Sequence, residues 1–255
     1  MIKQNKVVIT AGASGIGLET AREFVSTGHI VAICDIDETA LKSAKQALPS
    51  LITYQCDVSK PKETNLFIKS AAKQLQGIDT LVNNAGVGGP TKKIEDVTPE
   101  EWKNCIDICL GGQFNCISAS VKYLKESSNP SIINLSSAAG KMGFALRTPY
   151  SAAKWGVIGL SKSLAIELGE YGIRVNAVLP GIVSGKRQES ILKGKASARN
   201  ISFEEVESEA LSYSSIKQYV SPRDIAKQIV FLASHNGKMI SGQAISVCGD
   251  LKMLS

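Results

Sequence analysis

The sequence predicts an α/β fold in which helices cover both faces of a central parallel sheet. Short apolar runs rich in Val and Ile alternate with longer amphipathic stretches along the 255-residue chain, which is typical of repeated strand–helix–strand units. The runs are apolar throughout, as expected for strands buried on both faces. No linker or internal repeat interrupts the alternation, so we expect a single domain over residues 1–255.

Seven strands and six main helices are expected, in strict alternation. The strands are Lys6–Thr10, Ile30–Asp35, Leu51–Gln55, Thr80–Asn83, Ser131–Ser136, Ile173–Leu179 and Ala244–Val247. Apolar residues at helical spacing predict helices over Gly15–Ser26, Glu38–Ala47, Lys60–Leu75, Pro99–Glu126, Tyr150–Tyr171 and Pro222–Ser234. Residues 185–220 depart from this pattern because they are polar, helical in places and longer than a simple connection. A long insertion after a strand commonly covers a site, so we expect a helical substrate lid there, with a solvated helix pair as the alternative.

The composition argues against several classes of protein. The two histidines, His29 and His235, are too few for a zinc site built on several imidazoles, and no metal site is expected. The net charge of +6 is not gathered into a basic run, and 5% aromatic residues offer little for base stacking, so nucleic acid is not an expected partner. No apolar stretch approaches the roughly 18 residues of a membrane span.

The cysteines indicate a reducing environment. The six cysteines contain no C-x-x-C pair, and the N-terminal residues lead into no apolar signal region, so we expect a cytoplasmic protein. Cys105, Cys109 and Cys116 are spaced to share one face of a helix, where we expect buried structural thiols.

A turn of small residues follows the first expected strand directly. Residues 10–17 read Thr-Ala-Gly-Ala-Ser-Gly-Ile-Gly and lead into a helix. Small residues in this position let backbone N–H groups and the helix N-terminus approach a pyrophosphate, which is the arrangement of a Rossmann dinucleotide site. The contacts expected from this turn are Gly12, Ser14, Gly15, Ile16 and Gly17.

The second expected strand ends at Asp35. A carboxylate at that point accepts hydrogen bonds from the adenosine ribose and repels a 2′-phosphate. Ala13 and Ile36 occupy positions where a 2′-phosphate site would favour Arg or Lys. We therefore predict NAD as the cofactor, rather than NADP. Asp35 as a simple helix cap is the weaker alternative, because Asp37 is better placed for capping.

A second group of polar residues lies in the middle of the chain. Tyr150 and Lys154 are four residues apart at the start of an expected helix, so both side chains emerge from one face, and Ser137 ends the preceding strand. A tyrosine with an ordinary pKa of ~10 is a poor base, but a close, partly desolvated ammonium stabilises the phenolate. We predict that Tyr150 is an acid/base for an alcohol oxygen, that Ser137 orients this oxygen and that Lys154 tunes the tyrosine.

These segments together resemble the short-chain dehydrogenase/reductase family over nearly the whole chain. The matching residues are Thr10–Gly17, Asp57–Val58, Asn83–Gly86, Ser137, Tyr150–Lys154, Arg174–Val178 and Pro180–Gly181. The resemblance implies that Asp57, Val58, Asn84 and Val183 line the cofactor and that Tyr150 and Lys154 also contact it. It further implies a homotetramer built on the helices at Pro99–Glu126 and Tyr150–Tyr171 and on the last strand.

The chain departs from the family pattern in four places. Ala11 replaces the first glycine of the turn, which is tolerable if its φ is negative. Cys109 replaces an asparagine that holds a water in the proton relay, and a thiol bonds water poorly. Gly185 replaces a threonine that touches the nicotinamide carboxamide, with Ser184 as a candidate deputy. Residues Val247–Asp250 replace the usual acidic-Gly-Gly ending.

The expected function is hydride transfer between NAD and a secondary alcohol or ketone, with a small polyol, sugar or hydroxy acid as substrate. A 3-oxoacyl-carrier-protein reductase is the alternative within this class, and a non-catalytic NAD-binding sensor or scaffold is the alternative outside it. The early part of the lid adds a cue about the substrate. Its basic residues would favour an anionic substrate if two or three of them pointed inward, whereas on a solvated helix they would only balance the later glutamates. These residues are Lys186, Arg187, Lys193, Lys195 and Arg199.

Overall fold

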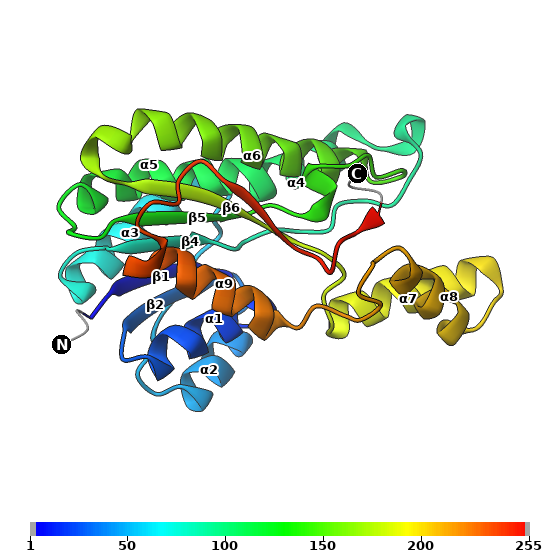
Figure 1. Ribbon diagram of the computed structural model, residues 1–255, viewed down its shortest axis with the longest axis horizontal. Helices are drawn as coiled ribbons and strands as arrows, with labels where there is room; N and C mark the ends of the chain where they lie inside the picture. Colours follow the sequence, from blue (N-terminus) through cyan, green and yellow to red (C-terminus); the bar gives the residue numbers. More distant parts are fainter. Residues whose placement is uncertain (1–3, 253–255) are drawn as a thin grey trace.

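The computed structural model describes residues 4–252, except the side chains of Arg187 and Ala198, and has the expected α/β architecture (Figure 1). Seven strands form one sheet in the order β3-β2-β1-β4-β5-β6-β7, and every neighbouring pair is parallel. The strands are β1 Lys6–Thr10, β2 Ile30–Asp35, β3 Ile52–Gln55, β4 Thr80–Asn83, β5 Ser131–Leu135, β6 Arg174–Pro180 and β7 Ala244–Val247. The strand order reverses between β1 and β4, so the crevice at the carboxyl ends of these two strands is where this fold binds ligands.

The helices begin where the sequence supplies their caps. The main helices are α1 Gly15–Ser26, α2 Glu38–Ala47, α3 Pro61–Leu75, α4 Pro99–Ile106, α5 Gly112–Leu124, α6 Thr148–Glu167, α7 Lys186–Arg199, α8 Phe203–Ser212 and α9 Pro222–Ala233. Capping boxes start α4, α8 and α9, and proline fills the first turn of α3, α4, α6 and α9.

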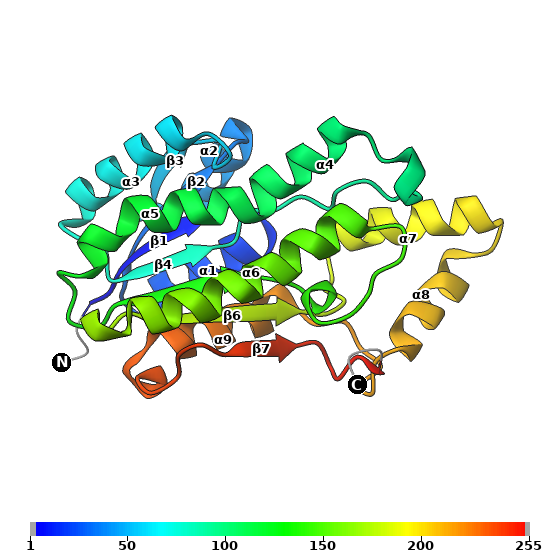
Figure 2. The same cartoon turned by 90° about the horizontal axis from the view of Figure 1, so that it is seen from above.

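Two hydrophobic layers sandwich the sheet. Helices α1, α2 and α9 cover one face and α3, α5 and α6 cover the other, as Figures 1 and 2 show. Alternate residues of β1 divide between the layers, with Val8 in the layer of α3 and Val7 and Ile9 in the layer of α1. Both layers are fully buried at their centres, which holds the carboxyl ends of the strands in fixed positions.

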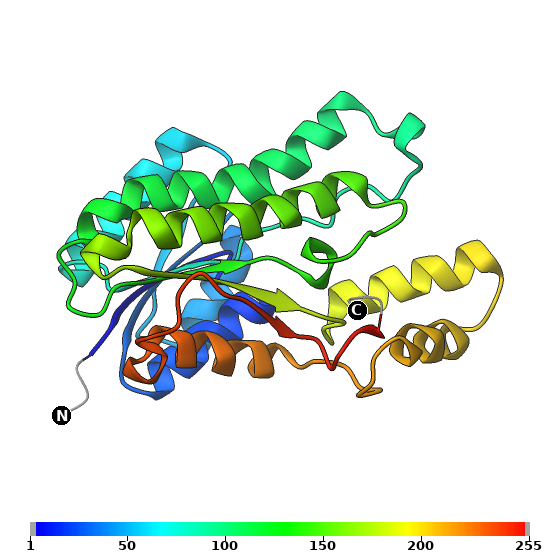
Figure 3. The same cartoon turned by 45° about the horizontal axis from the view of Figure 1, so that its top comes forward.

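The lid segment leaves the sheet after β6 and returns at α9. Its helices α7 and α8 extend beyond the carboxyl ends of the strands (Figure 3). An isolated parallel bridge joins Val183 to Val220, and the N–H of Val220 donates to the carbonyl of Ile182 over 2.9 Å. The two stems of the lid are therefore fastened side by side.

The expected single helix over Pro99–Glu126 is wrong in its middle. A π turn at Asp107–Gly111 separates α4 from α5, and such bulges are frequent at functional sites. A π turn holds more residues per turn than an α-helix, so the spacing of the cysteines no longer places all three on one face. Cys105 and Cys109 pack with Ala153, whereas Cys116 packs in the layer beneath α3.

Candidate functional site

Close backbone packing forces glycine into the turn after β1. A Cβ added at Gly12 would lie 2.6 Å from the Cβ of Ile33, and one added at Gly17 would lie 2.2 Å from the carbonyl oxygen of Ala11. Real side chains do not approach this closely. These two glycines are therefore needed to seat the turn and α1 against the sheet.

The outer side of the same turn is open. The first helical hydrogen bond of α1 runs from the N–H of Leu18 to the carbonyl of Ser14 over 3.1 Å, so the N–H groups of Gly15, Ile16 and Gly17 precede the helical ladder. Ser14 is exposed and its side chain makes no capping bond. A Cβ at Gly15 would meet nothing within 4 Å. An unhindered helix N-terminus of this kind fits the pyrophosphate of a dinucleotide.

The expectation that Ala11 has a negative φ, which would let it replace glycine without strain, is wrong. Its φ is +47°, in the left-handed region, which costs a residue with a Cβ about 1–2 kcal/mol. Tertiary contacts hold it there. The Asn84 amide donates to the carbonyls of Ala11 and Thr10 at 2.9 and 3.1 Å, and the N–H of Asn84 donates to the Thr10 hydroxyl at 3.0 Å. In this structure Asn84 braces the turn from the end of β4.

Asp35 lies beside the turn, at the carboxyl end of β2. Its carboxylate accepts from the N–H of Ala13 and from the N–H of Asp37, each over 3.2 Å. Asp37 instead caps α2, accepting from the N–H of Ala40 at 3.0 Å, as the sequence predicts. Ile36, the next residue, is 65% exposed, and its apolar side chain offers no positive charge to a 2′-phosphate. The carboxylate is thus rigidly placed next to the open turn.

Asp57 and Val58 follow β3 on the same edge of the sheet. Asp57 accepts from both the N–H and the hydroxyl of Ser59, at 3.0 and 2.7 Å. Val58 is buried, and its carbonyl accepts from the Asn115 amide at 2.9 Å. A Cβ at Gly112 would lie 2.7 Å from a methyl group of Val58, so the start of α5 fixes this pair.

Tyr150 and Lys154 meet on one face of α6. The Lys154 ammonium lies 5.7 Å from the centre of the Tyr150 ring and donates to the carbonyl of Leu135 at 2.7 Å. Lys154 is 4% exposed, although lysine is rarely buried without a strong reason. This lysine therefore places a desolvated positive charge next to the tyrosine.

Ser137 lies in the turn between β5 and α6. Its hydroxyl accepts from the N–H of Ala139 at 3.2 Å. Two hydrogen bonds fasten this turn to α6, from the Ser136 hydroxyl to the carbonyl of Lys154 at 2.7 Å and from the Ser151 hydroxyl to the carbonyl of Ala139 at 3.0 Å. The structure thus ties the turn that carries Ser137 to the first turns of the helix that carries Tyr150 and Lys154.

Cys109 is bonded to backbone behind the lysine. Its thiol donates to the carbonyl of Val87 and accepts from the N–H of the same residue, both at 3.3 Å. A Cβ at Gly86 would lie 3.6 Å from this sulfur and 3.4 Å from the Lys154 nitrogen. A hydrogen bond with Cys109 and burial raise the pKa of Cys105 well above its usual range, so the Cys105 thiol is uncharged.

Arg147 joins this group, although the sequence reasoning did not select it. Its guanidinium carbon lies 4.9 Å from the centre of the Tyr150 ring, and its Nε donates to the carbonyl of Gly88 at 3.0 Å. The available signal was a basic residue three positions before the tyrosine. The partner carbonyl lies far away in the sequence, and no local pattern identifies it.

The start of the lid explains one departure from the family pattern. Gly185 caps α7 with a φ of +135°, where any residue with a side chain would be strained. The N–H of Ser184 donates to the carbonyl of Val220 at 3.0 Å, which continues the bridge between Val183 and Val220. The expected cofactor contact Val183 is therefore held at the root of the lid.

Two basic residues of α7 form exposed ion pairs with glutamates, as expected for a solvated helix. Lys193 pairs with Glu189 and Arg199 with Glu209, each over 2.6 Å and largely exposed. The side chain of Arg187, one of the basic residues that would favour an anionic substrate, lies outside the described residues. The ion pairs favour the solvated alternative over selection of an anion.

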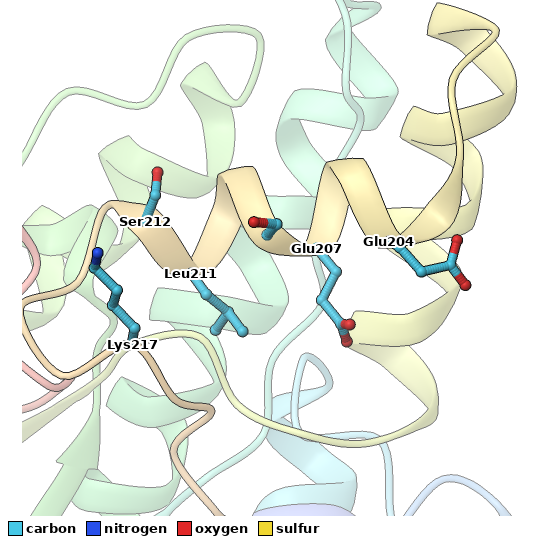
Figure 4. A pocket seen from close by; sticks show the side chains of 6 residues that line it. Glu204, Glu207, Leu211, Ser212 and Lys217 are labelled. Carbon is cyan, nitrogen blue, oxygen red and sulfur yellow. The ribbon is translucent and has the colours of Figure 1, made fainter.

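A hollow of about 350 Å³ runs along α8 (Figure 4). All its lining residues come from α8 and the loop after it, and the Glu204 and Glu207 carboxylates extend from this helix. Burial and the neighbouring Glu207 raise the pKa of Tyr219 to about 12, and the Tyr219 hydroxyl donates to Glu207 at 2.6 Å. This acidic hollow belongs to the lid and contains none of the expected site residues.

Two further observations concern binding of other kinds. Within residues 4–252, no helix is both long and apolar enough to cross a membrane. The same residues contain no group of three or more His, Cys, Asp or Glu side chains arranged to hold a metal ion.

Comparisons with known proteins agree with this architecture. A family model described as short chain dehydrogenase matches residues 5–196. A 3-oxoacyl-[acyl-carrier-protein] reductase of Staphylococcus epidermidis is 33% identical over 255 residues, covering 98% of this chain and 100% of the relative. A protein of Streptomyces coelicolor named as a ketoacyl reductase is 32% identical over 252 residues, with 96% and 95% coverage. The crystal structure of an actinorhodin polyketide ketoreductase variant with NADPH matches with a TM-score of 0.92 and 31% identity, covering 99% of each chain.

Proposed function

Because this chain belongs to the short-chain dehydrogenase/reductase family and is therefore a nicotinamide-dependent oxidoreductase of ketones and alcohols, we propose that it reduces the 3-keto group of acyl thioesters with NADH. The observation that carries the cofactor choice is the Asp35 carboxylate beside the open glycine turn. The relatives' names support the acyl substrate. A small polyol, sugar or hydroxy acid, favoured by the sequence reasoning, is the second candidate.

Residues at the carboxyl ends of β1, β2, β3, β4 and β6, together with two residues of α6, would hold the cofactor. Gly12, Ser14, Gly15, Ile16 and Gly17 would bind the pyrophosphate. Asp35 would accept from the adenosine ribose, and its charge would repel the extra phosphate of NADP. The rest of the cofactor site would be lined by Asp57, Val58, Asn84 and Val183. Tyr150 and Lys154 would contact the nicotinamide ribose. The polyketide ketoreductase structure contains NADPH, so this preference separates the present chain from that relative.

The protein's own part in the reaction is to move one proton. The bound cofactor supplies a hydride to the carbonyl carbon. Tyr150 would donate its hydroxyl proton to the ketone oxygen as the carbon–oxygen double bond becomes single, and in the reverse direction its phenolate would take the proton back. Ser137 would hold that oxygen by a hydrogen bond, and the buried Lys154 ammonium would stabilise the phenolate.

Assembly as a homotetramer remains a prediction. A hollow of about 460 Å³ between the outer faces of α5 and α6 is lined by apolar side chains that include Phe114, Val121, Leu160 and Leu164. These are two of the elements that the family resemblance implies for assembly. Light scattering or native mass spectrometry on the full chain would test the number of subunits.

Cofactor exchange tests the proposal. Reduction of 3-oxobutyryl-CoA should be at least about tenfold more efficient with NADH than with NADPH, as measured by kcat/KM, a difference of about 1.4 kcal/mol. Asp35→Ser should narrow this ratio, and Asp37→Ser, which removes a nearby carboxylate while serine can still cap α2, is the matched control. Equal efficiencies in the wild-type protein would refute the cofactor choice.

A substrate panel separates the candidates. Higher kcat/KM for polyols or hydroxy acids than for 3-oxoacyl thioesters would favour the second candidate. Tight NADH binding with no turnover on either set would favour the sensor or scaffold that the sequence left open. The placement of Ser137, Tyr150 and Lys154 together argues against the scaffold.

A further inference from the structure

We propose that Arg147 is a positioning residue for Tyr150, holding the ring in place and supplying a second cation that stabilises its phenolate. This inference rests on the proposed function, because it assigns a role in the same proton transfer. It concerns a residue outside the set Ser137, Tyr150 and Lys154, and it starts from the contacts of one guanidinium.

The Arg147 side chain bridges two loops. Its Nε and Nη2 both donate to the carbonyl of Gly88, in the loop that follows β4. A second bond joins the same two loops, from the N–H of Lys92 to the carbonyl of Leu146 at 2.9 Å. The loop before α6 is therefore clamped to the loop after β4 at two successive residues.

The ring of Tyr150 packs against this clamp. The guanidinium carbon lies 4.9 Å from the ring centre, within the range of a cation–π contact. On the Gly88 side, a Cβ added at Gly89 would lie 3.6 Å from the Cβ of Tyr150. Arg147 thus fixes both the ring and the loop that borders it.

The backbone at the clamp is strained. Leu146 has a φ of +63°, and a residue with a Cβ adopts this conformation only where surrounding contacts impose it. The Leu146 carbonyl is one of the two acceptors in the clamp. Strain adjacent to Arg147 indicates that the position of the guanidinium is specified by tertiary structure.

Two cations and two thiols face the Tyr150 ring. Lys154 lies 5.7 Å and Arg147 4.9 Å from the ring centre, both from the start of the tyrosine's own helix. Cys105 and Cys109 face it from α4 and the π turn. The hydrogen bond with Cys109 and burial raise the pKa of Cys105, so the Cys105 thiol does not oppose the cations, and both cations favour the negative phenolate.

The contacts of Cys109 lie next to those of the second cation, Arg147. Its thiol is occupied with the backbone of Val87, the residue before Gly88. Arg147 therefore holds one residue of this loop and Cys109 holds the preceding one. With a thiol where relatives place a relay amide, a fixed charge next to the ring supplies stabilisation that does not depend on that amide.

Two substitutions separate charge from shape. Arg147→Gln removes the charge and keeps a hydrogen-bond donor, whereas Arg147→Lys keeps the charge and loses the planar fork. The readout is the pH dependence of kcat for oxidation of 3-hydroxybutyryl-CoA with NAD, where the phenolate is the active form. Arg223→Gln, an exposed arginine of α9 paired with Glu23, is the matched control.

Arg147→Gln should move the midpoint of this profile upward by about one pH unit and lower kcat at neutral pH by up to about tenfold, with little change in the KM for NAD. Arg147→Lys should keep the wild-type midpoint. A Gln variant that melts like the wild type and retains its pH profile would overturn the proposal. So would equal shifts in the Gln and Lys variants, since they would show that charge has no part.

A second measurement works without turnover. Ultraviolet difference titration of the NADH-bound protein against its Tyr150→Phe variant reports the Tyr150 phenolate directly. Arg147→Gln should shift this titration upward, and no shift would overturn the proposal. Because the titration needs no substrate, a failed substrate assignment leaves its outcome interpretable.

Discussion

The glycine turn and the lid both lie beyond the carboxyl ends of the strands, but they are held in place differently. The turn leads into α1, whose Ala21 and Phe24 are fully buried in the main hydrophobic layer. The lid has a small cluster of its own around Leu192, Ala196 and Val206, and exposed ion pairs surround it. The glycine turn therefore shares the stability of the sheet, whereas the stability of the lid depends on its own local cluster.

The largest expected effect tests whether proton transfer depends on residues held by the sheet and its helices and not on the lid. Tyr150→Phe should lower kcat by about 10²–10⁴, because the hydroxyl that exchanges the proton is removed. NADH binding, followed by fluorescence, should change little. Lys193→Gln, which breaks an exposed lid pair, is the control and should change kcat less than about twofold. A larger loss of kcat in the lid variant than in Tyr150→Phe would contradict the assignment of Tyr150 as the acid/base.

A matched pair of leucines tests the difference in stability. Leu81 in β4 and Leu192 in α7 are both fully buried, and truncation of either should cost about 2–5 kcal/mol locally. Leu81→Ala should lower the global Tm. Leu192→Ala should leave the Tm nearly unchanged and speed amide hydrogen exchange in α7 and α8. Equal losses of Tm would show that the lid unfolds together with the sheet.

Relief of strain in the turn is a smaller effect. Ala11→Gly should raise the free energy of unfolding by about 1 kcal/mol, because glycine adopts the positive φ without a Cβ penalty. Chemical denaturation would measure it. Ala13→Gly, in the same turn but absent from the residues with positive φ, is the control. Destabilisation by Ala11→Gly would show that the methyl group contributes more packing than it costs in strain.

The smallest effect is expected at the thiol behind the lysine. Cys109→Asn should leave kcat within about threefold of wild type or raise it, because an amide can both donate to and accept from the backbone of Val87 as the thiol does. Steady-state kinetics on a variant with an unchanged Tm would measure this. A fall of more than about tenfold would mean that the larger side chain crowds a fully buried position.

The sequence was most informative where local pattern and burial agree. The strands lie within a residue or so of their predicted bounds, since continuous apolar runs bounded by turns leave little freedom. Asp37 as the cap of α2 was also predicted correctly. Most of the expected site residues stand at the carboxyl ends of strands or in the turns that follow, because parallel strands bring these ends to one edge, and Tyr150 and Lys154 join them from α6.

The remaining features depend on contacts between distant segments. The positive φ of Ala11 is imposed by Asn84, and the guanidinium of Arg147 is placed by the carbonyl of Gly88. The π turn at Asp107–Gly111 interrupts a sequence with ordinary helical periodicity, whose paired glycines Gly111 and Gly112 were its local sign. The conformation of Ala11 and the position of Arg147 could not be obtained from spacing alone, because each is fixed by a partner that the fold brings near.

The bridge between Val183 and Val220 makes the lid an exchangeable module. With both stems closed by backbone pairing, the intervening residues form a loop whose ends are set by the sheet and not by its own contents. The entropy of closing such a loop grows only slowly with its length, so longer or shorter inserts are tolerated. Grafting a lid from another family member between Gly185 and Val220 is therefore a test of whether this segment sets substrate preference.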